Sequence, residues 1–512
     1  MSPEGILADP PFREFDVAQL REHGIAVEEA ERQLALLLRP PARVRLDRPA
    51  TLGDGIETIS PSATPGLLAR HEVAAAAGRL TKFVPASGAA TRMFQDLIAL
   101  LDAERGGDPS IALDLLREIR RLPFREPLRD VLARAGQDLD ELQAGGAFLE
   151  ILGALLGPGG LDFAALPKGL LPFHAYREGI RTAFEEHLVE AAGTVRGADG
   201  TCRLHLTVSP EHLGRFRELL RTAGPGYERD LGVRFDVTFS LQKPSADTIA
   251  VEPDGRPLRD GGGRIVLRPS GHGALIENLN DLGGDVVLIK NVDNVQPDRL
   301  RGATLRWKRL LVGRLVEIEE RVRRYASALE RSAEPALLEE AEEFARWPLG
   351  HAAPYVSDGE ARRRQLQGAL SRPLRVCGVV RNTGEPGGGP FWVREASGGT
   401  SLQIVESAEV DRASAAQRAI LETATHFNPV DLVCGVCAPS GRPYDLRAFV
   451  NPDAVIVARK FQAGRELRVL ERPGLWNGAM ARWNTVFVEV PSATFTPVKT
   501  VFDLLRPEHQ PA

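Results

Sequence analysis

The stretch from Thr81 to Leu97 reads Thr-Lys-Phe-Val-Pro-Ala-Ser-Gly-Ala-Ala-Thr-Arg-Met-Phe-Gln-Asp-Leu. Its pattern predicts a short strand, then a loop of small residues, then a helix with Arg92 on its first turn. Small residues around Gly88 let backbone N–H groups approach an anion, while the helix start and Arg92 add positive potential. The stretch is therefore typical of a phosphate cradle, although such turns also occur as plain connections.

Short apolar runs rich in β-branched residues alternate with helical segments along the chain, which favours an α/β fold. The expected strands are residues 204–208, 233–239, 286–289, 375–380, 402–405, 432–436, 455–457 and 486–490. The expected helices are residues 181–192 and 211–221, followed by a helical block at 305–345 with one apolar and one charged face. We expect a mixed, mostly parallel central sheet with helical additions.

Charge and composition exclude several classes of partner. The net charge of -5 supplies no basic field that would gather nucleic acid or an anionic membrane. The chain has no apolar run of about 18 residues, and Met1 to Leu20 lacks the basic start and apolar block of a secretory signal. Four cysteines are too few for a disulfide framework in 512 residues, and the pair Cys434 and Cys437 suits a buried strand better than a zinc site. These features predict a cytoplasmic protein with no nucleic-acid or membrane partner.

Three later segments add candidate site residues. Lys168 stands between a proline and a glycine, where it could reach a phosphate or belong to an ordinary turn. Gly271 and Gly273 flank His272 at a helix start, which suits a flat ring or a ribose against the backbone, or a plain helix entry. The apolar strand before Asp293 would place this carboxylate at the carboxyl end of a sheet strand. Ligands gather there and Mg²⁺ could bind, although an aspartate can also form a turn.

The order of these segments resembles that of the UDP-sugar pyrophosphorylases, particularly the UDP-N-acetylhexosamine branch. The family pattern is Leu-Ala-Gly-Gly-Gln-Gly-Thr-Arg, then Pro-Lys-Gly, then Gly-Asn-Gly, then Val-Asp-Asn. It is matched here by residues 85–92, 167–169, 271–273 and 292–294. Residues 239–242, 403–410 and 426–428 continue the likeness, which covers roughly residues 80–300 and 373–490. The order of the motifs carries the resemblance, because no single motif is decisive.

The resemblance implies a nucleotide-diphospho-sugar transferase fold of the GT-A, Rossmann-like type. It implies a Mg²⁺-dependent nucleotidyltransferase that joins a UTP-like nucleoside triphosphate to a sugar 1-phosphate and releases pyrophosphate. Arg92 and Lys168 would be catalytic, and Asp293 would hold Mg²⁺. The implied nucleotide-binding residues are Ala86, Ser87, Gly88, Ala89, Ala90, Thr91, Gln242, Gly271, His272 and Gly273. The implied sugar-binding residues are Glu406, Asn428 and Arg482.

Four regions are expected on this basis. They are an N-terminal helical region at 1–78, a nucleotide-binding half at 79–302 with a helical insert at about 98–160, a helical insertion at 303–372, and a sugar-binding half with the C-terminal segment at 373–512. The sequence leaves the roles of the helical regions, the sugar, the base and the oligomeric state open.

The chain departs from the family pattern at several positions. Ser87 and Ala90 stand where the family loop has glycines, and His272 stands for the asparagine that reads uracil. Asp445 and Arg447 lie in a stretch that the relatives lack, so they receive no role. A closer resemblance joins the chain to an uncharacterised bacterial family that carries Phe-Val-Pro-Ala-Ser-Gly-Ala-Ala-Thr-Arg-Met and Pro-Gly-Leu-Trp-Asn-Gly-Ala-Met, but it brings no activity.

Two other functions fit part of the pattern. A glycosyltransferase of the GT-A type could use the same sheet, but it would usually carry Asp-X-Asp at the metal strand, where only Asp293 stands here. A non-catalytic nucleotide sensor would bind a nucleotide through the altered loop without turnover. In the Trp-rich segment after Pro473, Trp476 and Trp483 suit the core, whereas Asn477 and Asn484 are better candidates for polar recognition.

Overall fold

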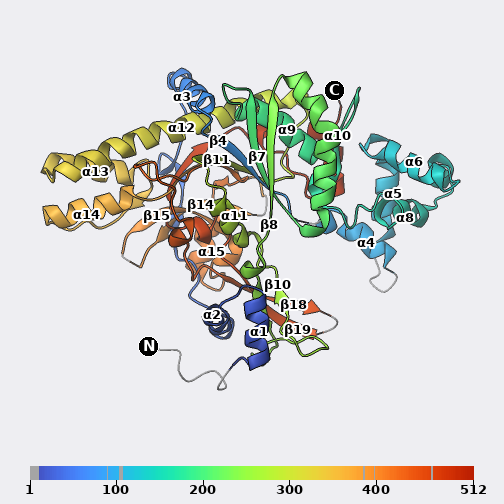
Figure 1. Cartoon of the computed structure of the whole chain (residues 1–512), viewed down its shortest axis with the longest axis horizontal. Coiled ribbons are helices and arrows are strands. Elements are labelled where there is room, and N and C mark those ends of the chain that lie inside the picture. The colour runs from blue at the N-terminus through green and yellow to red at the C-terminus, as the bar shows by residue number, and fades with distance from the viewer. Residues whose placement is uncertain are drawn as a thin grey trace. The chain divides into compact units, whose positions relative to one another are not determined.

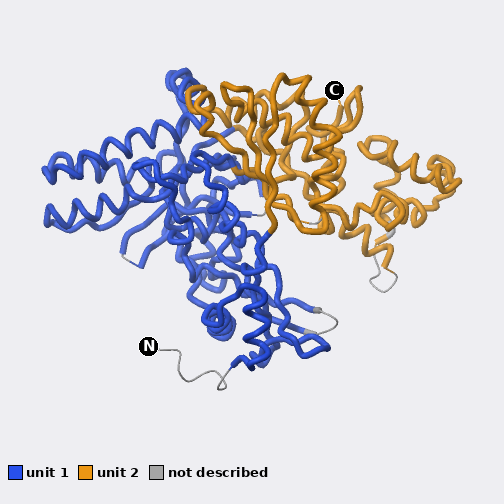
Figure 2. The backbone as a smooth tube through the Cα atoms, in the orientation of Figure 1, with its two compact units in different colours: residues 1–71, 242–288, 310–490 blue, residues 72–241, 289–309, 491–512 orange. Residues whose placement is uncertain are grey.

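The computed structural model describes residues 11–88, 90–102, 108–384, 387–396, 398–462 and 465–511. The chain divides into two compact units (Figure 2). The first unit contains residues 1–71, 242–288 and 310–490, and the second contains residues 72–241, 289–309 and 491–512. Each unit is thus assembled from segments that lie far apart in the sequence. The expected division into four regions stays a prediction.

The first unit combines helices with three sheets (Figure 1). Its helices are α1 (Glu14–Glu22), α2 (Val27–Leu38), α3 (Thr64–Ala76), α11 (Leu275–Asp281), α12 (Asp298–Arg331), α13 (Pro335–Arg346), α14 (Gly359–Leu370) and α15 (Ala415–Glu422). Its strands are β1 (Leu46–Pro49), β2 (Thr51–Leu52), β3 (Gly55–Glu57), β9 (Thr248–Val251), β10 (Leu267–Arg268), β11 (Val286–Lys290), β12 (His351–Ala352), β13 (Leu374–Arg381), β14 (Gly388–Arg394), β15 (Thr400–Glu406), β16 (His426–Phe427), β17 (Asp431–Gly435), β18 (Ile456–Gln462), β19 (Arg465–Glu471) and β20 (Asn484–Glu489). Helices α3 and α12 and strand β11 continue into the second unit.

The largest sheet of the first unit has the strand order β2-β3-β20-β13-β17-β11. Strands β2, β3, β20 and β13 pair in parallel, and β17 pairs with β13 antiparallel. Two antiparallel sheets accompany it, with the orders β1-β14-β15-β12 and β10-β9-β19-β18. Helices α1 and α2 close the second of these, because Leu20, Leu34 and Leu37 form one buried cluster with Ile249 and Leu470.

The second unit has a parallel sheet with the order β4-β7-β8 and a hairpin of β5 and β6. Its strands are β4 (Leu80–Pro85), β5 (Pro172–Tyr176), β6 (Gly179–Thr182), β7 (Thr201–Val208) and β8 (Arg234–Leu241). Its helices are α4 (Gln95–Leu101), α5 (Pro109–Glu118), α6 (Arg125–Arg134), α7 (Leu139–Ala144), α8 (Phe148–Leu156), α9 (Ala183–Thr194) and α10 (Leu213–Leu231). Phe184 of α9 and Phe216 of α10 contact each other and Phe239 of β8, so both helices pack on this sheet.

These elements confirm the expected mixed α/β organisation with mostly parallel sheet pairing. Each expected strand overlaps an observed one. The apolar residues of the predicted helical block are also buried, namely Leu310, Leu311, Leu315, Ile318, Val322, Tyr325 and Leu329. One local prediction is wrong. Arg92 ends a 3₁₀ turn, Ala90–Arg92, and α4 begins only at Gln95, so Arg92 does not lie on the first turn of an α-helix. Among the described residues, no helix has both the length and the apolar character needed to cross a membrane.

Candidate functional site

The carboxylate of Asp293 lies in the second unit, just beyond β11, and two lysines hold it. Lys168 Nζ donates to Asp293 Oδ2 at 2.8 Å. Lys499 Nζ lies 3.1 Å from the same oxygen and 3.4 Å from Oδ1. Asp293 is 7% exposed, so a nearly buried carboxylate meets two ammonium groups. Two of the predicted residues, Lys168 and Asp293, are therefore in direct contact.

The Pro-Lys-Gly turn packs directly against the segment that carries Asp293. A Cβ at Gly169 would stand 2.8 Å from Phe216 Cζ and 3.3 Å from a methyl group of Val292. Only glycine leaves room for this approach without a shift of the neighbouring side chains. The glycine after Lys168 thus has a packing reason, and the close approach places the ammonium beside the carboxylate.

Sequence reasoning missed Lys499, which comes from the C-terminal segment. Val498 N–H donates to the backbone oxygen of Asp293 at 3.0 Å, and Val498 O accepts from Lys168 Nζ at 2.7 Å. The amides of Lys499 and Thr500 both donate to Asp503 Oδ2 at 2.7 Å, which secures the turn. The capping pair of Thr500 and Asp503 signals a turn in the sequence, but it does not reveal which carboxylate the lysine meets.

The pKa values reflect this crowding of charge. Burial alone would raise the pKa of Asp293, but the ammonium groups of Lys499 and Lys168 outweigh it and hold the pKa below its ordinary value. Burial lowers the pKa of Lys168 although Asp293 opposes that shift. Two cations therefore share one anion, and the cluster carries an excess of positive charge where a phosphate oxygen could replace a lysine contact.

The side chains of this cluster decide whether it could bind a metal ion. Among the described residues, no group of three or more His, Cys, Asp or Glu side chains could hold a metal. Mg²⁺ in nucleotide sites is usually bound through one or two carboxylates, with substrate phosphates and waters supplying the other ligands. Asp293 fits that role as a single protein ligand, provided that Lys168 and Lys499 move to the incoming phosphates.

The predicted phosphate loop begins where β4 ends. Ala86 is buried and its N–H donates to Thr207 O at 2.9 Å, while the N–H of buried Ala90 donates to Leu166 O at 2.9 Å. Ser87 is half-buried, and Gly88, Thr91 and Arg92 are exposed; Ala89 lies outside the described residues. The bond to Leu166 ties the loop to the turn that carries Lys168. Two loop amides are thus occupied by structural bonds, whereas Gly88, Thr91 and Arg92 are open to solvent.

A buried charge network adjoins the residue before Asp293. Glu190 of α9 pairs with Lys82 of β4 at 2.9 Å and with Lys290 of β11 at 2.6 Å. His187 Nε2–H donates to Val292 O at 3.1 Å. Burial outweighs the attraction of Glu190 and lowers the pKa of Lys82 to about 7. The network holds the end of β11 and the residue before Asp293 in place.

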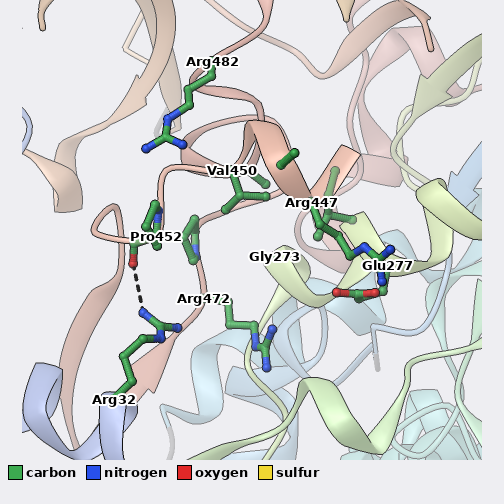
Figure 3. A pocket seen from close by; sticks show the side chains of 12 residues that line it. Arg32, Gly273, Glu277, Arg447, Val450, Pro452, Arg472 and Arg482 are labelled. Carbon is green, nitrogen blue, oxygen red and sulfur yellow. Dashed lines mark hydrogen bonds between the residues drawn. The ribbon is translucent and has the colours of Figure 1, made fainter. Parts of the chain in front are cut away.

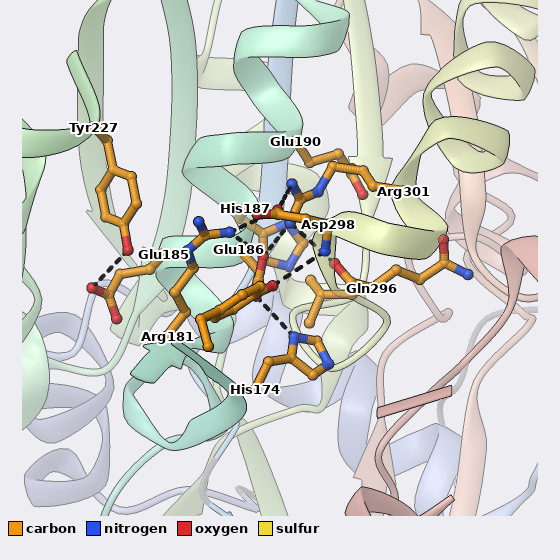
Figure 4. A network of polar contacts seen from close by, with 12 residues as sticks. His174, Arg181, Glu185, Glu186, His187, Glu190, Tyr227, Gln296, Asp298 and Arg301 are labelled. Carbon is orange, nitrogen blue, oxygen red and sulfur yellow. Dashed lines mark hydrogen bonds and ion pairs between the residues drawn. The ribbon is translucent and has the colours of Figure 1, made fainter. Parts of the chain in front are cut away.

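A second network supports the chain beyond Asp293. Glu186 is fully buried and accepts from His174 Nδ1 at 2.8 Å, from the Tyr176 hydroxyl at 2.5 Å and from Arg301. Arg301 also donates to Gln296 O at 3.2 Å (Figure 4). Several donors satisfy the Glu186 carboxylate, and Arg301 links it to the backbone of Gln296. The network therefore stabilises the loop after Asp293.

The predicted base-binding turn lies in the first unit. Gly271 has φ 79°, which only glycine adopts readily, and a Cβ at Gly273 would stand 2.3 Å from Pro473 O. His272 Nδ1 accepts from the N–H of Leu475 at 2.9 Å. The imidazole stacks on Trp476 at 4.2 Å between ring centroids with the planes 10° apart. Burial lowers the pKa of His272. The turn therefore carries a neutral aromatic stack that sequence reasoning did not foresee.

The three predicted sugar residues also lie in the first unit. Glu406 Oε1 is 4.0 Å from His272 Nε2, so these two side chains are neighbours. Asn428 is buried and its Oδ1 accepts from the N–H of Val430 at 2.9 Å, which gives it a structural role in the observed conformation. Arg482 is exposed and lines a pocket together with Gly273.

The other predicted polar residues, Gln242, Asn477 and Asn484, differ in whether their side chains have hydrogen-bond partners. Gln242, just after β8, has a buried Nε2 without a hydrogen-bond partner among the described residues. Asn477 Nδ2 donates to Glu409 at 3.0 Å and Asn484 Nδ2 donates to Ala369 O at 2.9 Å. Of the two tryptophans expected in the core, Trp483 is buried, whereas Trp476 is only half-buried. Asn477 is thus tied to a buried glutamate next to the Glu406 segment.

The fold and this arrangement define an α/β protein with a cluster of one carboxylate and two lysines at the end of a sheet strand. Residues 13–510 match the family described as "Domain of unknown function (DUF4301)", and the chain belongs to that family. None of the curated proteins compared with the chain matches it.

Several solved structures are similar to the chain. The UDP-N-acetylglucosamine pyrophosphorylase of Trypanosoma brucei, in complex with an inhibitor, is 15% identical with a TM-score of 0.49, and the match covers 96% of this chain and 79% of that one. A mutant UDP-glucose pyrophosphorylase of Leishmania major, in complex with UDP-glucose, is 12% identical with a TM-score of 0.45 over 98% and 79%. A UDP-glucose phosphorylase of Trypanosoma brucei is 12% identical with a TM-score of 0.44 over 97% and 80%. Identities and TM-scores this low leave the activity of this chain to be argued from its own residues.

Proposed function

We propose that the chain is a nucleotidyltransferase that joins a nucleoside triphosphate to a sugar 1-phosphate and releases pyrophosphate. The observation that carries the proposal is the contact of Asp293 with Lys168 and Lys499, in the same unit as the phosphate loop. The loop is bonded to the Lys168 turn through Ala90 and Leu166. The predicted phosphate loop, the Lys168 turn and the Asp293 turn are thus connected by contacts, and the C-terminal segment adds a second lysine, Lys499.

The chemistry requires positioning and charge neutralisation and no protein nucleophile. An oxygen of the sugar phosphate attacks the α-phosphorus of the triphosphate in line, the new P–O bond forms, and the bond to the β-phosphate oxygen breaks as pyrophosphate leaves. Lys168 and Lys499 would exchange their contact with Asp293 for phosphate oxygens and neutralise charge that moves to the leaving group. Arg92, exposed at the end of the loop, would bind the β- and γ-phosphates.

We propose Asp293 as the protein ligand of a Mg²⁺ ion that arrives with the triphosphate. When held by Asp293, Mg²⁺ would supply positive charge that stabilises the negative charge of the phosphates. The fold would then be of the nucleotide-diphospho-sugar transferase type. The roles implied for Gln242, Gly271, His272 and Gly273 at the base and ribose, and for Glu406, Asn428 and Arg482 at the sugar, stay predictions about residues of the first unit.

The test runs the reaction in reverse. The purified chain is incubated with Mg²⁺, labelled pyrophosphate and a panel of nucleoside diphosphate sugars, and the appearance of labelled nucleoside triphosphate is measured. We expect turnover of at least one member of the panel, loss of turnover in Asp293→Ala and Arg92→Ala, and loss on chelation of Mg²⁺. The matched control is Arg229→Ala, because Arg229 is an exposed arginine of α10 to which the proposal assigns no role.

Two outcomes would contradict the proposal. Failure to consume any member of the panel, with nucleotide binding intact, would make the chain a nucleotide sensor. Unchanged turnover in Asp293→Ala would remove the metal assignment.

A further inference from the structure

A pocket of about 360 Å³ lies within the first unit (Figure 3). Among the described residues that line it, four are arginines, Arg32, Arg447, Arg472 and Arg482, whereas Glu277 is the only acidic one. The volume falls within the range of small-molecule sites. A pocket with so many guanidinium groups favours an anionic ligand.

Two of the arginines are committed to carboxylates. Arg32 binds Glu29 through Nε at 2.8 Å and Nη2 at 3.0 Å. Arg447 binds Asp445 through Nε at 2.7 Å and Nη2 at 3.1 Å. Arg32 and Arg447 lie on opposite sides of the pocket in Figure 3, and these carboxylates hold their guanidinium groups there. They shape the site and leave Arg482, together with part of the Arg472 guanidinium, to meet a ligand.

Arg472 and Arg482 have unused donor capacity. Arg472 Nη2 donates to Ser245 O at 3.2 Å and lies 3.7 Å from Glu29 Oε1, but its buried Nε has no acceptor among the described residues. The exposed side chain of Arg482 makes no hydrogen bond or ion pair with another described residue. Buried N–H groups without acceptors are uncommon, and an oxyanion would satisfy them.

The rest of the lining is apolar and closely packed. Ile276 and Ala479 are buried, and Val450, Pro452 and Pro473 complete this surface. The N–H of Arg482 donates to Phe449 O at 3.4 Å, which anchors the backbone from which its side chain extends. Guanidinium groups beside an apolar surface suit an organic molecule that carries a phosphate better than a bare metal ion or another cation.

We propose that this pocket binds a phosphate monoester dianion, with Arg482 and Arg472 as its main ligands. The pocket shares Gly273 with the predicted base-binding turn. A sugar 1-phosphate would therefore be the molecule that carries the bound phosphate, and this part of the proposal rests on the proposed function. A free phosphate that regulates the protein has the same chemistry and is the alternative source.

The test measures binding by calorimetry with inorganic phosphate and with glucose 1-phosphate, in a buffer free of phosphate and without nucleotide. We expect Arg482→Ala and Arg472→Ala each to weaken binding about tenfold or more, because each removes a charge-assisted contact. Arg472→Lys should also weaken binding, because it keeps the charge and loses the fork. The control is Arg459→Ala, which removes an exposed arginine of β18 outside the pocket.

Two results would overturn the proposal. These are an absence of saturable phosphate binding by the wild type, and wild-type affinity in both Arg482→Ala and Arg472→Ala. Displacement of inorganic phosphate by glucose 1-phosphate would identify a sugar phosphate as the ligand, and failure of displacement would identify a free phosphate. Binding is measured without turnover, so a protein that binds phosphate but exchanges no pyrophosphate would refute only the proposed function.

Discussion

Lys499 Nζ lies 3.1 Å from Asp293 Oδ2 although the two residues are 206 positions apart in the chain. Lys499 is half exposed at its side chain, whereas Asp293 and Lys168 are largely enclosed. The carboxylate therefore has one enclosed cationic neighbour and one that is open to solvent. This asymmetry makes Lys499 the lysine best placed to follow a phosphate group as it enters and leaves.

Lys499→Ala should lower the rate of pyrophosphate-dependent cleavage of the nucleotide sugar by about 100-fold, because it removes a cation that stabilises the charge on the leaving group. Lys499→Arg should restore part of the rate. The measurement is the exchange rate at saturating nucleotide sugar, with Arg229→Ala as the control. A rate in Lys499→Ala equal to that of the control would show that Lys499 serves only the fold.

Asp293→Ala should destabilise the second unit by about 3 kcal/mol, because it leaves the enclosed ammonium of Lys168 without its carboxylate. Adding Lys168→Met should recover part of this loss, since the methionine needs no counter-ion. The measurement is the denaturant midpoint of the two variants and the wild type. Equal midpoints for the single and double variants would show that the two side chains are not coupled.

The same pair predicts a response to acid. The pKa of Asp293 is lowered in the folded protein, so its stabilising contribution is present above the ordinary value of 3.8 and is lost as the pH falls through the lowered pKa. The Asp293→Asn variant should be less stable than the wild type at neutral pH, and this difference in stability should shrink as the pH falls below about 4. Melting temperatures of both proteins at several pH values between about 3 and 7 measure this, and a deficit that stays constant over the range would contradict it.

Gly88→Ala should leave the melting temperature unchanged, because a Cβ there meets nothing within 4 Å. It should raise the KM for pyrophosphate several-fold if the loop backbone approaches phosphate closely. Gly273→Ala provides the contrast, because its Cβ would stand 2.3 Å from Pro473 O and must displace the backbone. An unchanged KM in Gly88→Ala would remove this glycine from the phosphate loop.

Glu409→Gln should remove a pH-dependent loss of stability. Burial raises the pKa of Glu409 to about 7 from an ordinary value of 4.5, although bonds from Glu406 N–H and Asn477 oppose the shift. A raised pKa favours the protonated form, so the wild type loses stability relative to the variant as the pH rises from 4.5 to about 7. The loss approaches about 3 kcal/mol above pH 7. Melting temperatures at about pH 5 and pH 8 test this, and a difference between the two proteins that does not change with pH would contradict it.

Local patterns predicted the elements of this fold well, because they depend on short-range sterics and on the periodicity of burial. The strand that ends at Pro85 and the apolar strand before Asp293 were both expected, and each is present. The turn around Lys168 was also expected, and the packing of Gly169 explains its composition. The start of α4 was misplaced, because a 3₁₀ turn often precedes an α-helix and a short sequence pattern does not distinguish the two.

The sequence by itself determined the alternation of strands and helices, the glycines at tight turns and the order of the polar motifs, since each of these depends on residues a few positions apart. Only the tertiary structure decided that Lys499 joins Lys168 at Asp293, that Trp476 stacks on His272, and that Arg472 and Arg482 line one pocket. Such contacts depend on how segments hundreds of residues apart pack together, and no local spacing encodes that packing.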